Sequence, residues 1–315
     1  MGPENWTQVT GFVLLGFPRN HILQALLFLG LTVAYVVTAT GNLLIIALSW
    51  VDHHLHTQMY FFLRNLSFLE LSLVSVVVPK MLVITLTGDH TISFVSCIIQ
   101  SYLCFLLDTT DFFLLAVMSL DRYLAICHPL HYETLMSGRV CSQLVLASWL
   151  AGFLWVLCPT ILVASLPFCG PNVIDHFFCD SWPLLKLSCR NTCLLEVVAF
   201  VLSMLVLLVS LGLTCFVHLH SCHGPPDPHC CREKESVLHC ASHLTVVVTV
   251  YGSSIFLYIH LSETQSLLFN KGASVLSCIV TPLLNSFIFS LCNNKMKQAL
   301  GDALRLLQPT AVRKL

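Results

Sequence analysis

Several ionisable side chains lie within or at the end of long apolar stretches: Glu70, Asp108, Asp111 and the adjacent pair Asp121-Arg122. Ionisable residues in apolar surroundings of this kind are rare and by default functional. Carboxyl groups placed there can share a proton, hold a cation or bind a polar ligand group. No nucleophile and base, and no metal-ligand triad, stand at a shared depth in these stretches, so we expect no enzyme activity.

The composition indicates which solvent surrounds these groups. The chain has 315 residues, of which 56% are hydrophobic and only 10% charged, with a mean hydropathy of +0.82. Soluble domains carry about 25% charged residues, so we expect lipid to cover much of the surface. The net charge of -1 argues against a nucleic-acid partner, whose binders show a clustered basic face.

Seven continuous apolar stretches are each long enough to cross a bilayer core, which takes about 20 residues. Because they are continuous and not alternating, they predict helices and not barrel strands. We therefore expect an all-α fold, a single seven-transmembrane domain over residues 1–315 with an N-terminus at about 1–23 and a tail at 292–315. The predicted spans are about 24–50, 58–83, 94–126, 140–166, 194–220, 236–261 and 267–291.

Orientation follows from the placement of basic residues. With the N-terminus outside, ten of the fifteen Lys and Arg residues fall on the inner side, as the positive-inside rule requires. A glycosylation sequon at Asn5 agrees with this orientation. Beyond the seventh span, Met296, Leu300 and Leu304 recur at helical spacing beside basic residues, which predicts a short amphipathic helix on the inner leaflet. We expect a multi-pass protein of the plasma membrane.

Several motifs occur in a fixed order along the chain. They are Phe12-Val13-Leu14-Leu15-Gly16-Phe17, Gly41-Asn42, Leu55-His56-Thr57-Gln58-Met59-Tyr60, Val78-Pro79-Lys80-Met81-Leu82, Met118-Ser119-Leu120-Asp121-Arg122-Tyr123-Leu124-Ala125-Ile126-Cys127-His128-Pro129-Leu130, Ser242-His243-Leu244-Thr245 and Pro282-Leu283-Leu284-Asn285. Together they resemble the olfactory (odorant) receptors, a family of rhodopsin-like G-protein-coupled receptors, over nearly the whole chain. The resemblance implies a small-molecule odorant as ligand, a stimulatory heterotrimeric G protein as partner, and the lipid bilayer as surroundings.

The resemblance also implies a mostly apolar odorant cavity in the outer half of the bundle. Its expected lining is Cys104, Phe105, Asp108, Thr109, Leu202, Ser203, Val206, Tyr251, Ser254, Ile255, Tyr258 and Cys278. An ionised Asp108 favours a cationic amine, whereas a protonated Asp108 only hydrogen-bonds to a neutral ligand. Because desolvation disfavours the charged form, we expect the protonated form, and both interpretations stay open.

Two further sites come from the resemblance. The activation switch for G-protein coupling comprises Asp121, Arg122, Tyr123 and Asn285, with Arg122 as the latch that releases when the inner face opens. A water or sodium site at the centre of the bundle comprises Asn42, Glu70, Asp111 and Asn285. In the alternative interpretation, Glu70 and Asp111 are neutral acids that donate hydrogen bonds. Apart from this sodium ion, no cofactor is expected.

Four cysteines are expected on the oxidising outer side, which allows three pairings. The resemblance favours Cys97–Cys179, which ties the third span to the long loop that follows the fourth, and Cys169–Cys189 within that loop. A Cys97–Cys189 pairing stays open. The inner stretch from His218 to Cys231 is rich in His and Cys, but its spacing fits no standard zinc pattern, so we predict no metal site there.

Departures from the family pattern concentrate on the inner half. They are Gln58, Leu120, Ser210, Val217, His218, Ser286, Phe289 and Cys292. Two of the changes remove tyrosine hydroxyls that are expected to stabilise the open inner face, so the active state could be sparsely populated. A first alternative is therefore a receptor that binds odorants but signals weakly or not at all. A second is a small ion transporter or channel that uses Glu70, Asp108 and Asp111 as its path.

Overall fold

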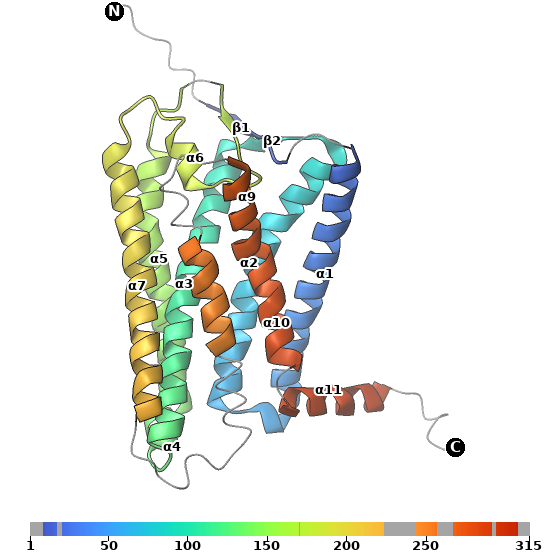
Figure 1. The fold of residues 1–315 in the computed structure, drawn as a ribbon, viewed down its shortest axis with the longest axis vertical. Coiled ribbons are helices and arrows are strands. Elements are labelled where there is room, and N and C mark those ends of the chain that lie inside the picture. The colour runs from blue at the N-terminus through green and yellow to red at the C-terminus, as the bar shows by residue number, and fades with distance from the viewer. Residues whose placement is uncertain are drawn as a thin grey trace, which may run out of the picture.

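The apolar stretches form helices because a helix satisfies its own backbone hydrogen bonds without water. The computed structural model describes residues 9–17, 21–169, 171–223, 244–256, 267–291 and 294–307. Its long helices stand side by side in one bundle (Figure 1), which confirms the expected all-α class. Six described helices are long and apolar enough to cross a membrane, and the sixth predicted span is described only over the shorter helix Leu244–Phe256.

The spanning helices follow the order of the chain. They are α1 (His21–Val51), α2 (Gln58–Thr87), α3 (Phe94–Cys127), α5 (Gly138–Ala164), α7 (Cys193–His223), the helix Leu244–Phe256, and a last span made of α9 (Leu267–Val275), the π-helical turn η2 (Leu276–Val280) and α10 (Thr281–Leu291). Three short helices lie in the connections: η1 (His53–Leu55), α4 (Tyr132–Leu135) and α6 (Ser181–Leu185). The helix α11 (Asn294–Leu307) lies crosswise at one end of the bundle (Figure 1).

Local sequence signals explain where α2 ends and where α3 begins. The helix α2 ends at Gly88, whose φ of 68° is left-handed and suits glycine. The helix α3 begins after Ser93, whose hydroxyl accepts a hydrogen bond from the Ser96 backbone N–H at 3.1 Å. Pro79 and Pro159 lie inside α2 and α5, as membrane helices tolerate.

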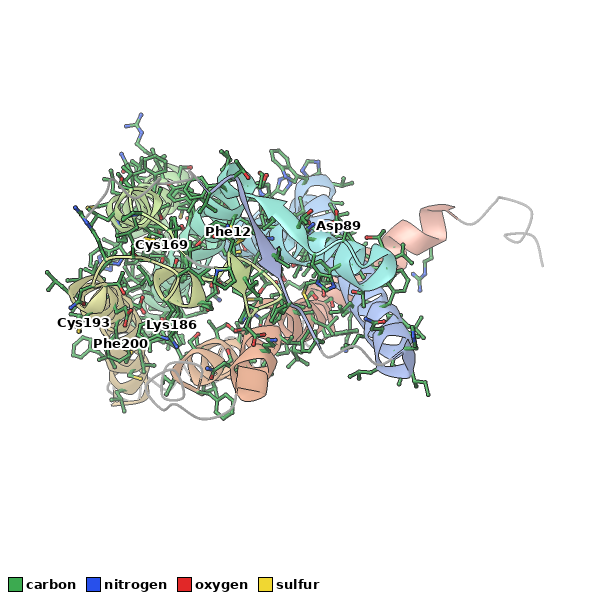
Figure 2. The ribbon with its side chains drawn as sticks, turned by 90° about the horizontal axis from the view of Figure 1, so that it is seen from above. Phe12, Asp89, Cys169, Lys186, Cys193 and Phe200 are labelled. Atoms are coloured by element: carbon green, nitrogen blue, oxygen red, sulfur yellow. A yellow bond between two sulfur atoms is a disulfide. The ribbon has the colours of Figure 1, made fainter. Side chains whose placement is uncertain are left out.

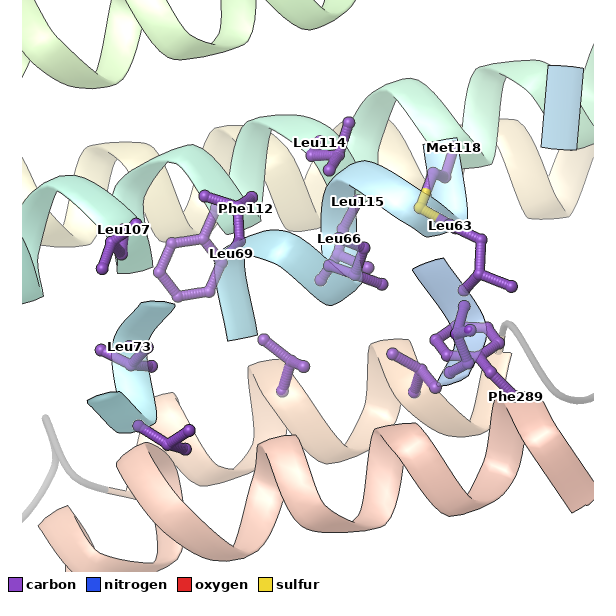
Figure 3. Packing of buried hydrophobic residues seen from close by; sticks show 14 of the residues in the cluster. Leu63, Leu66, Leu69, Leu73, Leu107, Phe112, Leu114, Leu115, Met118 and Phe289 are labelled. Atoms are coloured by element: carbon purple, nitrogen blue, oxygen red, sulfur yellow. The ribbon is translucent and has the colours of Figure 1, made fainter. Parts of the chain in front are cut away.

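A long apolar core runs along the middle of the bundle. Leu63, Leu66, Leu115, Met118 and Phe289 pack together in it, from α2, α3 and α10 (Figure 3). The outward faces of the helices are also apolar, with exposed side chains that would be costly in water. Those on α1 and α7 include Leu26, Leu29, Val33, Val36, Leu205, Leu208 and Val209. This distribution fits a bundle whose solvent is lipid.

The upper end of the bundle, as drawn in Figure 1, carries a small sheet that the sequence did not predict. The strand β1 (Gly11–Leu14) pairs antiparallel with β2 (Thr91–Ser93) and parallel with β3 (Val173–Ile174), in the order β2-β1-β3. Phe12 and Leu14 of β1 point into a buried cluster and are almost completely covered. Viewed from above in Figure 2, Phe12 lies among the connecting loops, so the N-terminal segment is part of the cap over this end.

Two disulfide bonds strengthen the same cap. Cys97 at the start of α3 is bonded to Cys179 in the loop between α5 and α7, and Cys169 is bonded to Cys189 within that loop. This is the pairing that the resemblance favoured, and it is confirmed. The alternative pairing of Cys97 with Cys189 is excluded.

Candidate functional site

The upper half of the bundle contains a cavity of about 170 Å³. It lies between α3, α5, α7, the helix Leu244–Phe256 and the last span, and the loop that carries α6 closes it. Apolar residues dominate its wall, with a few polar groups among them, as in sites for small organic ligands. Phe105, Phe112, Trp155, Phe178 and Trp182 supply its aromatic surface.

Most of the predicted lining residues surround this cavity. They are Cys104, Phe105, Asp108 and Thr109 of α3, Leu202, Ser203 and Val206 of α7, Ser254, and Cys278 of η2. Two predicted residues do not line it. The ring of Tyr251 packs 5.4 Å from that of Phe112, and Ile255 packs against the apolar core. Tyr258 lies outside the described residues.

The loop between α5 and α7 contributes lining residues that the prediction missed. Asp180 begins α6 by accepting a hydrogen bond from the Trp182 backbone N–H at 3.3 Å. The hydroxyls of Ser101 and Ser181 lie 3.0 Å apart and join α6 to α3. Burial raises the pKa of Asp180 to about 6. The signal that could have found Asp180 is its position directly after Cys179, because the disulfide to α3 brings the next residue to the top of the cavity.

A second, much smaller cavity of about 30 Å³ lies below the first. Within it the Asn285 side-chain amide donates a hydrogen bond to Glu70 Oε1 at 2.7 Å. Asp111 Oδ1 and Asn285 Oδ1 are buried and have no hydrogen-bond partner among the described residues. Asn42 is completely buried and within electrostatic range of Glu70, but it does not line this cavity. The structure therefore brings together Glu70, Asp111 and Asn285, with Asn42 behind them.

These groups suit a water molecule or a hard monovalent cation. The cavity has room for about one water-sized occupant, and two unpartnered oxygens face a site where carboxyl and amide oxygens converge. Oxygen ligands of this kind are the ones that hard cations prefer. The residues present thus fit the sodium ion that the resemblance implied.

The two cavities share part of their walls. Asp108, Phe112, Ser254 and Ser277 line both of them. A ligand group that contacts Asp108 in the upper cavity therefore lies one side chain away from the central polar site. This shared wall offers a direct physical connection between the ligand and the middle of the bundle.

The lower end of α3 carries a buried ionic cluster. The Arg122 Nε donates a hydrogen bond to Asp121 Oδ2 at 3.0 Å, and Asp121 is only 1% exposed. The hydroxyl of Tyr132, in α4, donates a second hydrogen bond to Asp121 Oδ1 at 2.6 Å. Burial and the neighbouring Asp121 charge raise the pKa of Tyr132, so it remains a hydrogen-bond donor.

The remaining switch residues lie apart from this cluster. The Tyr123 ring lies edge-on to His128, with centroids 5.7 Å apart, and Asn285 bonds to Glu70 in the central site. Tyr132 was not predicted, although it follows Asp121 by only eleven residues. The distance from α3 to α4 depends on how the connecting loop turns, which no local pattern in the sequence specifies.

The structure also shows what several departing residues do. Ser210 donates from its hydroxyl to the carbonyl of Val206 at 2.7 Å, and it has the backbone N–H that a proline lacks. Ser286 lies at the close approach of α10 to Gly41 of α1, where a Cβ on Gly41 would come within 3.1 Å of the Ser286 Cβ. Phe289 is buried in the apolar core, and Leu120 faces outward. The side chain of His218 and all of Cys292 lie outside the described residues.

Comparisons with known proteins give a consistent result. The family described as 7 transmembrane receptor (rhodopsin family) matches residues 41–295. The chain is 71% identical to Olfactory receptor 6T1 of Homo sapiens, over 100% of this chain and 98% of that protein, and 46% identical to Olfactory receptor 6E1 of Mus musculus, over 95% and 96%. The crystal structure of squid rhodopsin superposes with a TM-score of 0.72 at 15% identity, covering 91% of this chain and 82% of the other.

Proposed function

Because this chain belongs to the olfactory receptors within the rhodopsin family of seven-transmembrane receptors, we propose that it binds small, mostly apolar odorants and activates a stimulatory heterotrimeric G protein. The ligand site is the upper cavity, and the G protein binds at the opposite end, beside Asp121 and Arg122. The N-terminus is then extracellular, at the plasma membrane, in keeping with the excess of basic residues on the inner side.

The observation that carries this proposal is the cavity itself. It lies between the spanning helices and under a loop that carries both disulfides, and its wall is mostly apolar. A small ligand that fills such a site gains free energy by removing apolar surface from water. Its few polar groups, among them Asp108, Thr109 and Ser203, then select the ligand by hydrogen bonding.

Signalling requires that ligand binding favour an open lower end. The cluster of Asp121, Arg122 and Tyr132 ties α3 to α4 and holds Arg122 against its own helix, so it represents the closed, inactive arrangement. Asp108 belongs to the walls of both cavities, which gives a bound ligand a route to the central polar site. A ligand that binds more tightly when this site rearranges shifts the equilibrium toward the open state.

The central site completes this proposal. A sodium ion there would be held by oxygens of Glu70, Asp111 and Asn285, and its single charge would compensate one of the two buried carboxyl groups. Without the ion, a bound water molecule can supply the missing hydrogen bonds to Asp111 and Asn285. Either occupant stabilises the arrangement in which Asn285 is bonded to Glu70.

A cell-based cAMP assay against a broad odorant panel tests the proposal. Cells that display the receptor are expected to raise cAMP with at least one compound, and a cavity-filling change such as Ser203→Phe is expected to abolish that response without lowering surface expression. Binding of a compound to the purified receptor, without any ligand-driven or constitutive cAMP, would favour the weakly signalling alternative. Ion flux in proteoliposomes, without a cAMP response, would favour the transporter alternative.

A further inference from the structure

The upper cavity is lined by two carboxyl groups that come from different parts of the fold. Asp108 lies on α3, and Asp180 lies at the start of α6 in the loop above it. Both are within electrostatic range of the thiols of Cys104 and Cys278, which also line the cavity. The two carboxyl groups therefore border the same small space.

Neither carboxyl group is neutralised by the protein. Asp108 has no hydrogen bond or ion pair to any described residue, and no Lys, Arg or His side chain of the described residues lines the cavity. Asp180 accepts a hydrogen bond from the Trp182 backbone, which carries no charge. Burying a carboxylate without an opposite charge is costly, so a positively charged ligand group in the cavity would be attracted by both carboxyl groups.

Two more features of the wall are suited to a cationic ligand. Ser274 of α9 lines the cavity, is only 3% exposed, and makes no side-chain hydrogen bond within the described residues. Its hydroxyl oxygen can accept a hydrogen bond from a ligand donor. The aromatic rings of Phe105, Phe178 and Trp182 line the same space, and their faces attract organic cations.

We propose that this receptor recognises small organic amines, whose ammonium group is held by Asp108 and Asp180 while the hydrocarbon part contacts the aromatic wall. This inference rests on the proposed function of the cavity and names its ligand class. It makes Asp180 a specificity residue, contributed by the disulfide-tied loop. It also replaces the expectation of a neutral ligand, which considered Asp108 alone.

The choice between a cationic and a neutral ligand depends on whether the ligand compensates the charge of the two carboxyl groups. A neutral alcohol leaves them either uncompensated or protonated, and it gains only ordinary hydrogen bonds. An ammonium group supplies one positive charge, which the two carboxyl groups share, and up to three donors. Hydrogen bonds between charged partners are about twice as strong as neutral ones, so the same carbon skeleton is expected to bind better as an amine.

Matched pairs of ligands test this proposal in cells that carry the full-length receptor. The pairs are cyclohexylamine with cyclohexanol and hexylamine with hexanol, each pair sharing one carbon skeleton. The readouts are the cAMP concentration–response curve and, on purified receptor, the thermal stabilisation by each compound. We expect the amine of at least one pair to be about 10-fold or more potent than its alcohol.

Removing the charge of each carboxyl group in turn then shows whether that group causes the preference for the amine. Asp108→Asn and Asp180→Asn are each expected to weaken the amine response by about 10- to 100-fold and to leave the response to the alcohol within about threefold. Asparagine caps a helix as well as aspartate does, so Asp180→Asn keeps the start of α6. The matched control is Asp89→Asn, which removes the same charge at the exposed Asp89 near β2, away from the cavity.

Each outcome decides the inference. The inference is supported if the receptor prefers the amines, both cavity variants abolish this preference, and Asp89→Asn preserves it. The inference is overturned if the alcohols act as well as or better than the amines. It is also overturned if amine potency is unchanged in properly displayed Asp108→Asn and Asp180→Asn receptors. Both outcomes leave the proposed odorant-receptor function intact. If no compound of either pair gives a cAMP response or thermal stabilisation, the amine inference is overturned. The proposed function is contradicted only if the broad odorant panel also gives neither.

Discussion

The hydroxyl of Tyr132 donates a hydrogen bond to Asp121 Oδ1 at 2.6 Å, while Arg122 binds the other carboxylate oxygen. The short helix α4 is thereby attached to the lower end of α3 through a carboxylate that is almost completely buried. In the proposed mechanism, opening of this end requires that Arg122 leave Asp121, and Tyr132 helps to hold the carboxylate in the closed geometry.

Loss of the Tyr132 hydroxyl is expected to raise the basal activity. In Tyr132→Phe the ring remains but Asp121 loses a charge-assisted hydrogen bond, which weakens the closed state by about 1 kcal/mol and raises the active population about fivefold. Basal cAMP, normalised to surface expression, measures this effect. Tyr35→Phe is the control, because its hydroxyl pairs with Ser75 far from the cluster. Unchanged basal cAMP in Tyr132→Phe would contradict the assigned role.

The upper cap is expected to depend on one buried lysine. Lys271 of α9 donates hydrogen bonds to Asp175 Oδ1 at 2.5 Å and to the Gly16 carbonyl at 2.6 Å. It therefore joins the last span to the segment that follows β1 and to the loop that follows β3. Because Asp175 is 39% exposed, solvent screens the pair, and we expect a coupling energy of only about 1 kcal/mol.

A double-mutant cycle with Lys271→Met and Asp175→Asn measures this coupling through thermal unfolding of the purified receptor. Each single variant is expected to lower the melting temperature, and the double variant to lower it by less than the sum. Strict additivity of the two changes would mean that the ion pair contributes nothing to the cap.

Acidification is expected to weaken the cap through His176. This side chain is buried against Phe177 and Phe178, and burial, together with the charge of Lys271, lowers its pKa to about 3. The unfolded histidine has a pKa near 6.5, so below that pH the unfolded state binds more protons than the folded state. The stability present above pH 6.5 therefore falls as the pH decreases, by about 1 kcal/mol between pH 7 and pH 5.5.

Asp180 acts in the opposite direction, because its raised pKa makes the folded state gain a proton and some stability as the pH falls toward 6. Comparison of the wild type with His176→Gln at each pH cancels this contribution. The stability difference between the two proteins should shrink below pH 6.5. A difference that stays constant from pH 7.5 to pH 5.5 would show that His176 does not titrate as expected.

Local features of the sequence predicted the helical bundle, and the resemblance to the family implied the upper cavity and most of its lining. Apolar length determines the spans, and residues four apart on α3, such as Cys104 and Asp108, must share a face. Tyr251 and Ile255, which were expected in the lining of the upper cavity, do not line it among the described residues. Whether these side chains face the cavity depends on how their helix is rotated about its own axis. The sequence of a helix that is apolar all round does not indicate this rotation.

Contacts between distant segments could not be predicted in the same way. Lys271 and Asp175 are 96 residues apart, and Asp180 reaches the cavity only because its loop folds under two disulfides. The N-terminal strand β1 pairs with β2 and β3, two short strands that lie far from it in the sequence. No periodic pattern links such partners, so only the folded structure identifies them.

The central site is expected to respond to sodium. If the ion binds oxygens of Glu70, Asp111 and Asn285, sodium chloride should raise the melting temperature of the purified receptor above its value in potassium chloride at equal ionic strength. Glu70→Gln keeps the size of the side chain but removes its charge, and should eliminate the difference. Equal melting temperatures of the wild type in the two salts would instead favour water as the occupant.

The central claim is that a ligand in the upper cavity opens the lower end to a G protein. Purified receptor in lipid nanodiscs, mixed with purified stimulatory G protein, tests it most directly through the rate of nucleotide exchange with and without an active ligand. We predict that the ligand accelerates exchange, and that the acceleration disappears in the cavity-filling variant Ser203→Phe. A ligand that binds the wild-type receptor but leaves the exchange rate unchanged would contradict the account.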